Sequence, residues 1–389
     1  MLVPPEGDSY SLFDTPDEPD STSETQAEPA PEAELESESD LDAMSATVLL
    51  TGGTGLIGSH AAALFREMGW RVRALIRPTS DAAFLEELGC EFVVADLTDP
   101  DAVSGAAAGC EVVVHSAAQL GKPASMDRHV EVNVEGTRRI LKEAIDSAVR
   151  RFVHISSVAA YGAPFDESIL PLDEETPLDD PIPEEDHYSL TKRMAEEVVR
   201  KVGRRIEWCI LRPDIVMGER DRLFTPRILR WASRPVLSTL GMGANDLPLV
   251  YAGNVALAVW LAATQDAAAW QTYNVTDDGE LTQKTLVRIA AGRGPDAPVL
   301  PVPVPLVAAA CRIGTVFGRI IPGVRPGVLT PRRIRLFTEG DPYDGALIRE
   351  ELGWKPTVST EDGWRRSVEW YRAYMARKAS TGLEVRNEA

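Results

Sequence analysis

The chain has 389 residues, of which 60 are acidic and 40 are basic, and its formal net charge is −20. That length allows two domains, or one large domain with an appendage. Fourteen of the acidic residues and no Lys or Arg fall in residues 1–43, so only −6 remains for residues 44–389. The folded part is therefore mildly acidic, and no broad basic patch indicates nucleic-acid binding.

The four cysteines, Cys90, Cys110, Cys209 and Cys311, are far apart in the sequence. Their spacing fits neither a disulfide framework nor a metal site, so we predict no bound metal and a reduced, cytoplasmic compartment. The N-terminus lacks the basic and apolar regions of a secretory signal. No uninterrupted apolar run reaches the roughly 20 residues of a bilayer span, so we expect no integral membrane segment.

Residues 1–43 are rich in Glu, Asp, Pro, Ser and Thr. Such a segment cannot bury enough apolar surface to offset the entropy lost on ordering, so we predict that it is disordered. We interpret it as a solvated leader, or as a start site assigned too early, with Met44 as the true initiator. An acidic interaction tail is the alternative. Residues 376–389 are expected to be a flexible C-terminus.

From Thr47 onward, short apolar strands alternate with amphipathic helices, which show apolar residues three and four positions apart. In chain order we expect strands at 47–50, 71–76, 91–95, 111–115, 151–155 and 206–211, separated by helices at 57–68, 81–88, 101–108, 130–148 and about 188–202. Strands and helices that alternate with short connections form a parallel sheet with helices on both faces. The sequence therefore predicts an α/β fold.

Beyond Pro213 the pattern becomes irregular and rich in proline. We expect residues 44–212 to form a nucleotide-binding domain, and 213–375 to form a smaller substrate-binding region with segments that return to the first domain. Residues 299–311 are apolar, but prolines interrupt them and Arg312 ends them, so they are too short to span a bilayer. A buried helix with its lead-in is the favoured interpretation, and a lipid-facing or substrate-facing flap is the alternative.

Three glycines, Gly52, Gly55 and Gly58, lie between the first strand and the first helix. A tight turn there needs glycine conformations, and it lets a pyrophosphate approach the backbone at the positive N-terminus of the helix. Within an alternating pattern, this turn predicts a dinucleotide site. The fold is then a Rossmann-type doubly wound parallel sheet with a smaller mixed C-terminal substrate-binding region.

The strand at 71–76 should end with the residue that recognises the adenosine ribose. NAD sites usually place a carboxylate there, whereas this chain has Arg77, and no acidic residue lies between Arg71 and Ser80. Because a guanidinium suits a 2′-phosphate, we predict NADP, with NAD as the alternative. Asp81 lies a few residues on and can reach the ribose hydroxyls instead.

Tyr188 and Lys192 are four residues apart, which on a helix places both side chains on one face. A nearby ammonium favours phenolate, so we expect the pKa of Tyr188 to be lowered from about 10. Such a tyrosine can exchange a proton with an alcohol or ketone near neutral pH. The spacing alone is common by chance, and its weight comes from the dinucleotide pattern upstream.

From Ala46 to Arg372 the sequence resembles the extended short-chain dehydrogenase/reductase family, the NAD-dependent epimerase/dehydratase-like group. The matching motifs occur in the order found in that family. They are Thr51–Gly58 (T-G-x-x-G-x-x-G), Asp96–Leu97, Val113–Ala118, Asn133–Thr137 (N-V-x-G-T), Ile155–Gly162, Tyr188–Lys192 (Y-x-x-x-K), Leu211–Pro213 (L-R-P) and Glu351–Pro356 (E-L-G-W-x-P).

The resemblance implies roles for individual residues. Ser157 would hydrogen-bond the substrate oxygen, Tyr188 would be the general acid or base, and Lys192 would hold the nicotinamide ribose and depress the pKa of Tyr188. The residues expected to contact the cofactor are Gly52, Gly55, Leu56, Ile57, Gly58, Arg77, Asp96, Leu97, Ala117, Ala118, Asn133, Tyr188, Lys192 and Pro213.

The resemblance also implies a homodimer, because family members commonly pair through the helices that correspond here to about 130–148 and 188–202. The candidates for the seam recur at helical spacing on the second helix: Leu190, Met194, Val198 and Val202. The same four side chains can equally form the face that packs on the sheet.

Three features discriminate among the reactions of the family. Dehydratases that resemble it carry Thr-Asp-Glu where this chain has Ser157–Ala159, which leaves no acid or base for elimination of water. Many epimerases end the second strand with Asp, where this chain has Arg77. Residues 241–245 and 249–256 resemble the G-x-G-x-N…V-Y-V-x-N-V-A segment of the 3β-hydroxysteroid dehydrogenase-like branch, near the dihydroflavonol reductases, which handles lipophilic alcohols and ketones.

We therefore predict an NAD(P)-dependent oxidoreductase acting on the CH–OH group of a bulky, lipophilic small molecule, sterol-like. A sugar-nucleotide epimerase is the second hypothesis, supported by Arg227, Arg230 and Arg234, which can bind a diphosphate. A regulator that binds NADP without turnover is the third, and the joint presence of Ser157, Tyr188 and Lys192 argues against it.

Overall fold

The computed structural model describes residues 46–99, 101–120, 124–162, 170–179, 181–277, 279, 281–307, 309 and 331–380. The tail predicted at 1–43, Met44 and Cys311 lie outside these residues. Contacts within the chain separate Met1–Met44 from Ser45–Ala389, and the fold is that of the second unit.

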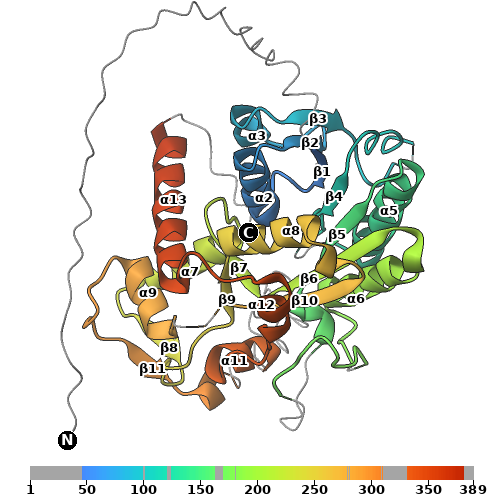
Figure 1. Ribbon diagram of the computed structural model, residues 1–389. Helices are drawn as coiled ribbons and strands as arrows, with labels where there is room; N and C mark the ends of the chain where they lie inside the picture. Colours follow the sequence, from blue (N-terminus) through green and yellow to red (C-terminus); the bar gives the residue numbers. More distant parts are fainter. Residues whose placement is uncertain are drawn as a thin grey trace, which may run out of the picture. The chain divides into compact units, whose positions relative to one another are not determined.

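Seven parallel strands form the central sheet in the order β10-β6-β5-β4-β1-β2-β3 (Figure 1). Their bounds are β1 (Thr47–Thr51), β2 (Arg71–Ile76), β3 (Glu91–Val94), β4 (Val112–His115), β5 (Arg151–Ile155), β6 (Glu207–Pro213) and β10 (Gln271–Val275). The strand order reverses at β1, which pairs with β2 on one side and β4 on the other. The predicted doubly wound fold is thereby confirmed. In such sheets, ligands bind at the carboxyl ends of the strands beside the reversal.

Helices cover both faces of the sheet, because its central strands are apolar on both sides. One layer contains α2 (Leu56–Glu67) and α8 (Ala252–Thr264), and the other contains α5 (Gly136–Asp146) and α6 (His187–Arg200). Val48 and Leu50 of β1 belong to the first layer and Leu49 to the second, as side chains alternate along a strand. The short helices are α3 (Ala83–Glu87), η2 (Val158–Tyr161), η4 (Gly203–Arg205) and η5 (Asp266–Ala268).

The helix predicted at 130–148 is the end of a longer helical run. It begins with α4 (Met126–His129), continues through a π-helical stretch, η1 (Val130–Glu135), and ends with α5. π-helical turns within helices frequently occur at functional sites. Here the turn carries the buried side chain of Asn133.

A smaller region follows β6 and occupies the lower left of Figure 1. Two short parallel sheets form it, one of β7 (Ile215–Met217) with β9 (Leu249–Tyr251), the other of β8 (Ser238–Leu240) with β11 (Leu300–Val302). Its helices are α7 (Phe224–Ala232), α9 (Gln283–Ala291), α11 (Pro331–Thr338) and α13 (Thr360–Ser380).

The chain after Pro213 contributes to both regions. Trp364 of α13 is fully buried in the core of the smaller region. In contrast α8, β10 and α12 (Ala346–Leu352) pack in the core of the main sheet. The domain boundary at 213 stays a prediction. α13 continues to Ser380, so the first part of the segment expected to be flexible, 376–389, is helical, and 381–389 lie outside the described residues.

The helix predicted at 101–108 is wrong, since turns occupy these residues. Gly105 and Gly109 have φ angles of 77° and 72°, which a right-handed helix cannot include. The backbone bonds there span three residues, such as Ala106 N to Val103 O at 3.2 Å. The alanine-rich composition favoured a helix that Gly105 interrupts.

The buried helix with its lead-in, favoured for 299–311, is only partly found where the structure describes that segment: residues 304–307 and 309 are helical, but they are not buried. Residues 300–302 form β11, and the side chains of Leu300 and Leu306 are 57% and 64% exposed. Pro301 and Pro303 precede the helical residues, and Pro305 lies in their first turn, where a missing backbone N–H is tolerated. Residues 308, 310 and 311 lie outside the described part of the chain.

The four residues expected to form a dimer seam do not share one outer face. Val198 and Val202 pack against the core of the sheet, whereas Met194 is 37% exposed and Leu190 is partly exposed. The outer side of α5 is charged and carries ion pairs within the helical run. The homodimer stays a prediction.

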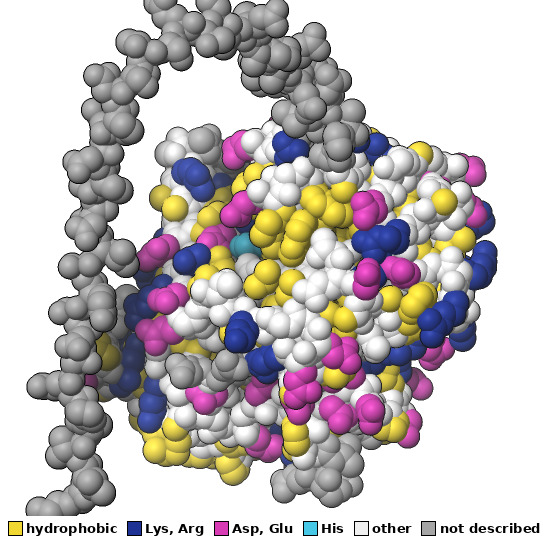
Figure 2. Space-filling view, viewed as in Figure 1, with side chains coloured by type: hydrophobic (Ala, Val, Ile, Leu, Met, Phe, Trp, Pro, Cys, Tyr) yellow, Lys and Arg dark blue, Asp and Glu magenta, His cyan; other side chains and the backbone are white. Residues whose placement is uncertain are grey.

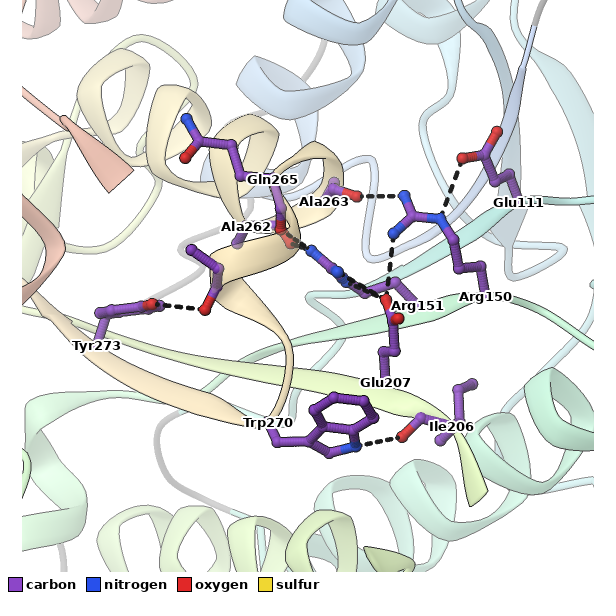
Figure 3. A network of polar contacts seen from close by, with 11 residues as sticks. Glu111, Arg150, Arg151, Ile206, Glu207, Ala262, Ala263, Gln265, Trp270 and Tyr273 are labelled. Atoms are coloured by element: carbon purple, nitrogen blue, oxygen red, sulfur yellow. Dashed lines mark hydrogen bonds and ion pairs between the residues drawn. The ribbon is translucent and has the colours of Figure 1, made fainter. Parts of the chain in front are cut away.

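Figure 3 shows a polar network at the amino-terminal ends of β5 and β6, which begin with Arg151 and Glu207. Arg151 is fully buried, and its Nε donates to Glu207 Oε2 at 3.0 Å. Its Nη1 donates to the carbonyl oxygens of Ala262, at 3.1 Å, and of Gln265. Arg150 Nη2 donates in the same way to a third carbonyl at 2.9 Å. The last carbonyls of a helix lack helical partners, so these guanidinium groups cap the C-terminus of α8.

Among the described helices, none is long and apolar enough to cross a membrane. Cys90, Cys110 and Cys209 are free and buried. Figure 2 shows an apolar area near the centre of this face, where Figure 1 draws α2 and α8. Trp260 of α8 and Trp70, which follows α2, pack edge to face with centroids 5.6 Å apart and are partly buried.

Candidate active site

The turn after β1 packs closely against the turn after β4. Gly52 has a φ of +71°, and a Cβ there would lie 2.6 Å from the Ala117 nitrogen. At Gly58 a Cβ would lie 2.2 Å from the Gly52 oxygen. Both positions therefore require glycine. Gly55, between them, is exposed.

The N-terminus of α2 lies at this turn without a capping side chain. Its N-cap residue is Gly55, no side chain accepts from the first turn, and that turn holds no acidic residue. Leu56 and Ile57, the first residues of the helix, are partly buried. The free N–H groups and partial positive charge of such a terminus suit a phosphate. The turn therefore fits a dinucleotide pyrophosphate, as the glycine spacing predicted.

Arginines lie around the ends of β2 and β3. Arg77 follows β2, is exposed, and its backbone N–H donates to Ser80 Oγ at 3.2 Å. Asp96 follows β3 and accepts from the nitrogen and hydroxyl of Thr98, at 2.9 and 2.8 Å. The backbone hydrogen bond from Thr98 lowers the pKa of Asp96, and the charges of Arg128 and Arg77 lower it further. Both guanidinium groups are therefore near this carboxylate.

Two other predicted residues have structural partners here. Leu97 is buried, and a Cβ on Gly136 would lie 3.3 Å from its Cβ, so Leu97 packs against the start of α5. Asp81 forms an ion pair with Arg222 at 3.7 Å. Ribose hydroxyls would therefore have to compete with Arg222 for the Asp81 carboxylate.

Asn133 ties the loop after β4 to α6. Its Oδ1 accepts from the Gln119 nitrogen at 2.6 Å, and its Nδ2 donates to Thr191 Oγ1 at 2.9 Å. The loop includes Ala117 and Ala118, which are partly buried. Both polar atoms of the Asn133 amide bond within the protein, so its side chain positions the loop, and its contact with a cofactor stays a prediction.

Ser157, Tyr188 and Lys192 come together at the carboxyl end of β5. Ser157 follows β5, accepts from the Ala159 nitrogen at 3.1 Å, and its side chain hydrogen-bonds with the Tyr188 phenol. Lys192 lies one turn further along α6 and is 4% exposed. Its Nζ donates to Ile155 O at 2.7 Å and lies 5.9 Å from the centre of the Tyr188 ring.

The expected lowering of the Tyr188 pKa is not found. Burial raises the pKa of Tyr188 to about 12, while the hydrogen bond with Ser157 acts in the opposite direction. Burial also lowers the pKa of Lys192 to about 8, opposed by the charge of Glu196. Desolvation disfavours both charged forms, and at this separation it outweighs the attraction between them. The phenol is therefore protonated at neutral pH and is placed to donate a proton.

A buried ion pair beside this group was not expected from the sequence. Glu196 and Arg212 each have 1% side-chain exposure, and two bonds of 2.9 and 2.7 Å join them. Ser156 Oγ donates to Glu196 Oε1 at 2.6 Å, which ties α6 to the end of β5. Glu196 follows Lys192 by four residues, as Lys192 follows Tyr188. That continued helical spacing is the pattern by which it could have been found.

Two buried histidines stack near Lys192, with ring centroids 5.6 Å apart. His115 hydrogen-bonds to the Thr51 and Thr137 hydroxyls, at 2.7 and 3.0 Å. Burial, followed by the charge of Lys192, lowers the pKa of His115 to about 3 and that of His154 well below its usual value. Both rings are therefore neutral at physiological pH.

A pair of carboxyl groups lies where β6 ends. Pro213 is buried, and Asp214 follows it and hydrogen-bonds with Asp341 of the loop before α12. Burial raises the pKa of Asp214 well above its usual range, and the charge of Asp341 raises it further. Burial raises the pKa of Asp341 too. The two carboxyl groups therefore share a proton and hold that loop against the sheet.

Among the described residues, no group of His, Cys, Asp or Glu is placed to bind a metal ion. A glycine turn at an uncapped helix N-terminus, beside a serine–tyrosine–lysine group, defines a dinucleotide-dependent enzyme with a Rossmann-type fold. The chain belongs to the NAD dependent epimerase/dehydratase family, whose model matches residues 48–276. The resemblance inferred from the motifs is confirmed.

Relatives of the chain include a dehydrogenase and a reductase by name. Sterol-4-alpha-carboxylate 3-dehydrogenase, decarboxylating, of Candida albicans is 29% identical over 83% of this chain and 97% of its own length. The 2-alkyl-3-oxoalkanoate reductase of Stenotrophomonas maltophilia is 29% identical over 82% of this chain and 97% of its own. A short-chain dehydrogenase/reductase superfamily protein from Agrobacterium tumefaciens, solved with bound NAD, is 26% identical, with a TM-score of 0.62 over 86% of this chain and 99% of that one.

Proposed function

We propose that this protein is an NAD(P)-dependent oxidoreductase that transfers a hydride between the nicotinamide and a bulky, lipophilic secondary alcohol or ketone, with a sterol-like compound as the best match. The observation that carries the proposal is the Ser157–Tyr188 hydrogen bond, with Lys192 one turn away. Two relatives named for lipophilic substrates, the sterol carboxylate dehydrogenase and the oxoalkanoate reductase, support the substrate class.

In the reductive direction, the proton comes from Tyr188. A reduced nicotinamide, held by the glycine turn at the start of α2, would supply the hydride to the carbonyl carbon, whose carbon–oxygen π bond would break. The Tyr188 hydroxyl, protonated because burial raises its pKa to about 12, donates its proton to the resulting oxygen. Ser157 donates a hydrogen bond to the same oxygen, so developing negative charge meets two donors.

Lys192 stabilises the phenolate that this proton transfer leaves behind. Its Nζ is held by Ile155 O at 2.7 Å, and the buried charge of Glu196 favours the ammonium form. Glu196 is itself held by Arg212 and Ser156, so it keeps one position relative to α6 and β5. We infer that Glu196 acts through Lys192 as a positioning residue.

We further propose NADP as the preferred cofactor. Arg77 stands where an acidic residue would favour NAD, and it and Arg128 both act on the pKa of Asp96. A charge-assisted hydrogen bond to a 2′-phosphate is worth about 1.5–3 kcal/mol. At about 1.4 kcal/mol per tenfold, that is a preference of roughly 10- to 150-fold for NADPH over NADH.

The catalytic proposal is tested by NADPH and NADH oxidation with steroid ketones, 2-alkyl-3-oxoalkanoates, flavonoids and UDP-sugars. Tyr188→Phe should lower turnover by about 100-fold or more, the scale of a lost general acid, without changing the cofactor Kd. Tyr371→Phe, on α13, is the control and should retain full activity. Near wild-type turnover in Tyr188→Phe would reject the assignment.

The cofactor proposal is tested by dissociation constants for both nucleotides. Arg77→Ala should weaken NADPH binding by roughly 10- to 150-fold and leave NADH binding nearly unchanged. Arg138→Ala, an exposed arginine of α5, is the control. Equal affinity of the wild type for both nucleotides, or equal losses in the variant, would show that Arg77 does not bind the phosphate.

Sugar-nucleotide epimerization is the second candidate, because the matching family includes epimerases by name. Arg227, Arg230 and Arg234 are all exposed along α7 and the turn after it, where a diphosphate can reach them. Conversion of a UDP-sugar without net change in nicotinamide absorbance, in the same screen, would favour this candidate over the first.

A further inference from the structure

The sheet of β8 and β11 carries an unusual set of exposed apolar side chains. Among the described residues, five large apolar side chains are more than half exposed, and one of these, Val94, lies on β3. The other four, here called the β8–β11 face, are Val236 (60%), Met242 (67%), Leu300 (57%) and Leu306 (64%). Exposed apolar groups that gather in this way mark interaction sites.

The four side chains come from two paired segments. The Leu300 nitrogen donates to Leu237 O at 2.9 Å, which places Leu300 beside Val236. The Gly241 nitrogen donates to Val302 O at 2.8 Å. A Cβ on Gly241 would lie 3.4 Å from Val304, so the turn with Met242 meets the helical residues 304–307, which include Leu306. Hydrophobic side chains are visible along the lower left of Figure 2, where Figure 1 draws β8 and β11.

The two chain segments that supply this face lack acidic residues. Residues 222–245 contain four arginines and no Asp or Glu, and residues 297–338 contain six arginines and no Asp or Glu. The chain as a whole has 60 acidic residues and a net charge of −20. Among the described residues, β8, β11 and the residues that directly flank them, 235–245 and 297–307, therefore carry no acidic side chain.

Cationic side chains border the face in the structure. Arg293 Nη2 donates to Pro235 O at 3.3 Å, which places this exposed guanidinium next to Val236. Arg234, also exposed, precedes the same strand. Lys284 lies near Met242, because its nitrogen donates to Gly243 O at 3.3 Å. Acidic residues stand just outside the acid-free segments, at Asp221, Asp246, Asp296 and Glu339.

We propose that the β8–β11 face docks the protein on an anionic phospholipid bilayer. Its apolar side chains enter the headgroup boundary while the bordering arginines contact lipid phosphates, the combination that holds a protein on a membrane surface without spanning it. The arginines also explain how a chain of net charge −20 approaches a negative surface, since charges beyond about 10 Å are screened by salt.

A second copy of the chain suits this face less well. A symmetric dimer would bring the same face of each copy together, so the bordering arginines would meet arginines. Like charges opposed across an interface disfavour association. A bilayer of anionic lipid offers both an apolar layer and the opposite charge. The proposal does not depend on which alcohol or ketone is the substrate.

The experiment is sedimentation of the full chain with vesicles of phosphatidylcholine, alone or with about one third phosphatidylglycerol. The wild type should bind the anionic vesicles, and raising the salt should weaken this binding. The double change Leu300→Asp and Leu306→Asp should lower the partition coefficient by about tenfold or more. The double change Arg234→Ala and Arg293→Ala should lower it by about fivefold per arginine on anionic vesicles only.

Val94→Asp is the matched control, because Val94 is equally exposed on β3 and should not affect binding. Thermal melts establish that each variant is folded; if the leucine variant is not, Val236→Asp with Met242→Asp takes its place. Failure of the wild type to bind, or equal binding by variants and wild type, overturns the proposal. A third outcome also overturns it: the wild type is a dimer by light scattering and does not bind vesicles, and the leucine variant is a monomer. That result would assign the face to a second copy of the chain.

Discussion

Replacing Lys192 with methionine separates the effect of its ammonium group on catalysis from its effect on the free energy of unfolding. Burial lowers the pKa of Lys192 from 10.5 to about 8. At about 1.4 kcal/mol per pKa unit, keeping the charged amine in the site costs about 3 kcal/mol near neutral pH. The variant also loses the bond to Ile155 O, and an unpaired buried carbonyl costs about 1–3 kcal/mol. Lys192→Met should therefore be inactive, yet between equally stable and about 2 kcal/mol more stable.

The pH dependence of this difference is the sharper test. The cost of the buried ammonium is present in full below the folded pKa of about 8. It is relieved as the pH rises toward the unfolded value, because the wild type then folds with a neutral amine while the unfolded chain still binds the proton. By about pH 9.5 the wild type should have recovered about 2 kcal/mol relative to the variant.

Urea unfolding followed by circular dichroism, near pH 7 and near pH 9.5, measures both free energies. Lys142→Met is the control, since the Lys142 side chain is 75% exposed on α5 and should show no such change. A difference between wild type and Lys192→Met that is the same at both pH values would refute the argument that the buried lysine is held in its charged form.

Three further predictions concern charged groups. Arg151→Met should destabilise the protein by about 1–3 kcal/mol in urea unfolding, because the carbonyls of Ala262 and Gln265 lose their donor while Glu207 keeps Arg150; an unchanged free energy of unfolding would contradict this. Asp214→Asn should raise the melting temperature near pH 7 but not near pH 4. A carboxyl group whose pKa is raised by folding destabilises the folded state as the pH rises, and the variant lacks that carboxyl group. Equal changes in melting temperature at the two pH values would count against a shared proton. Ketone reduction should decline as the pH rises through about 8, where Lys192 loses its proton, and a rate independent of pH up to about 10 would exclude that role.

Features that depend on neighbours in the sequence were predictable. Gly52 and Gly58 are required by the shape of a single turn, and the turn type follows from their spacing. Tyr188 and Lys192 share a helix face because of the period of the helix, whatever surrounds it. The strands at 71–76 and 151–155 were predicted with their observed bounds, because short apolar runs flanked by breakers have few alternatives.

Other features depend on which distant segments meet. The pKa of Tyr188 rises because the site is buried, and burial cannot be seen from a spacing of four residues. Asn133 is engaged by Gln119 and Thr191, which are 14 and 58 residues away in the sequence. Likewise, Arg212 reaches Glu196 only because β6 lies under α6.

The segment at 299–307 illustrates the same division. Its apolar composition is evident in the sequence, and so is the absence of acidic residues around it. Whether those side chains lie in the core or at the surface depends on pairing with β8, which leaves Leu300 and Leu306 exposed. By itself the sequence determined the glycine turn, the helix faces, the alternation of strands and helices and the charge of each segment, because these follow from local backbone geometry and composition. Only the tertiary structure decided burial, and with it the protonation of Tyr188 and Lys192, since solvent exclusion is a property of the assembled chain.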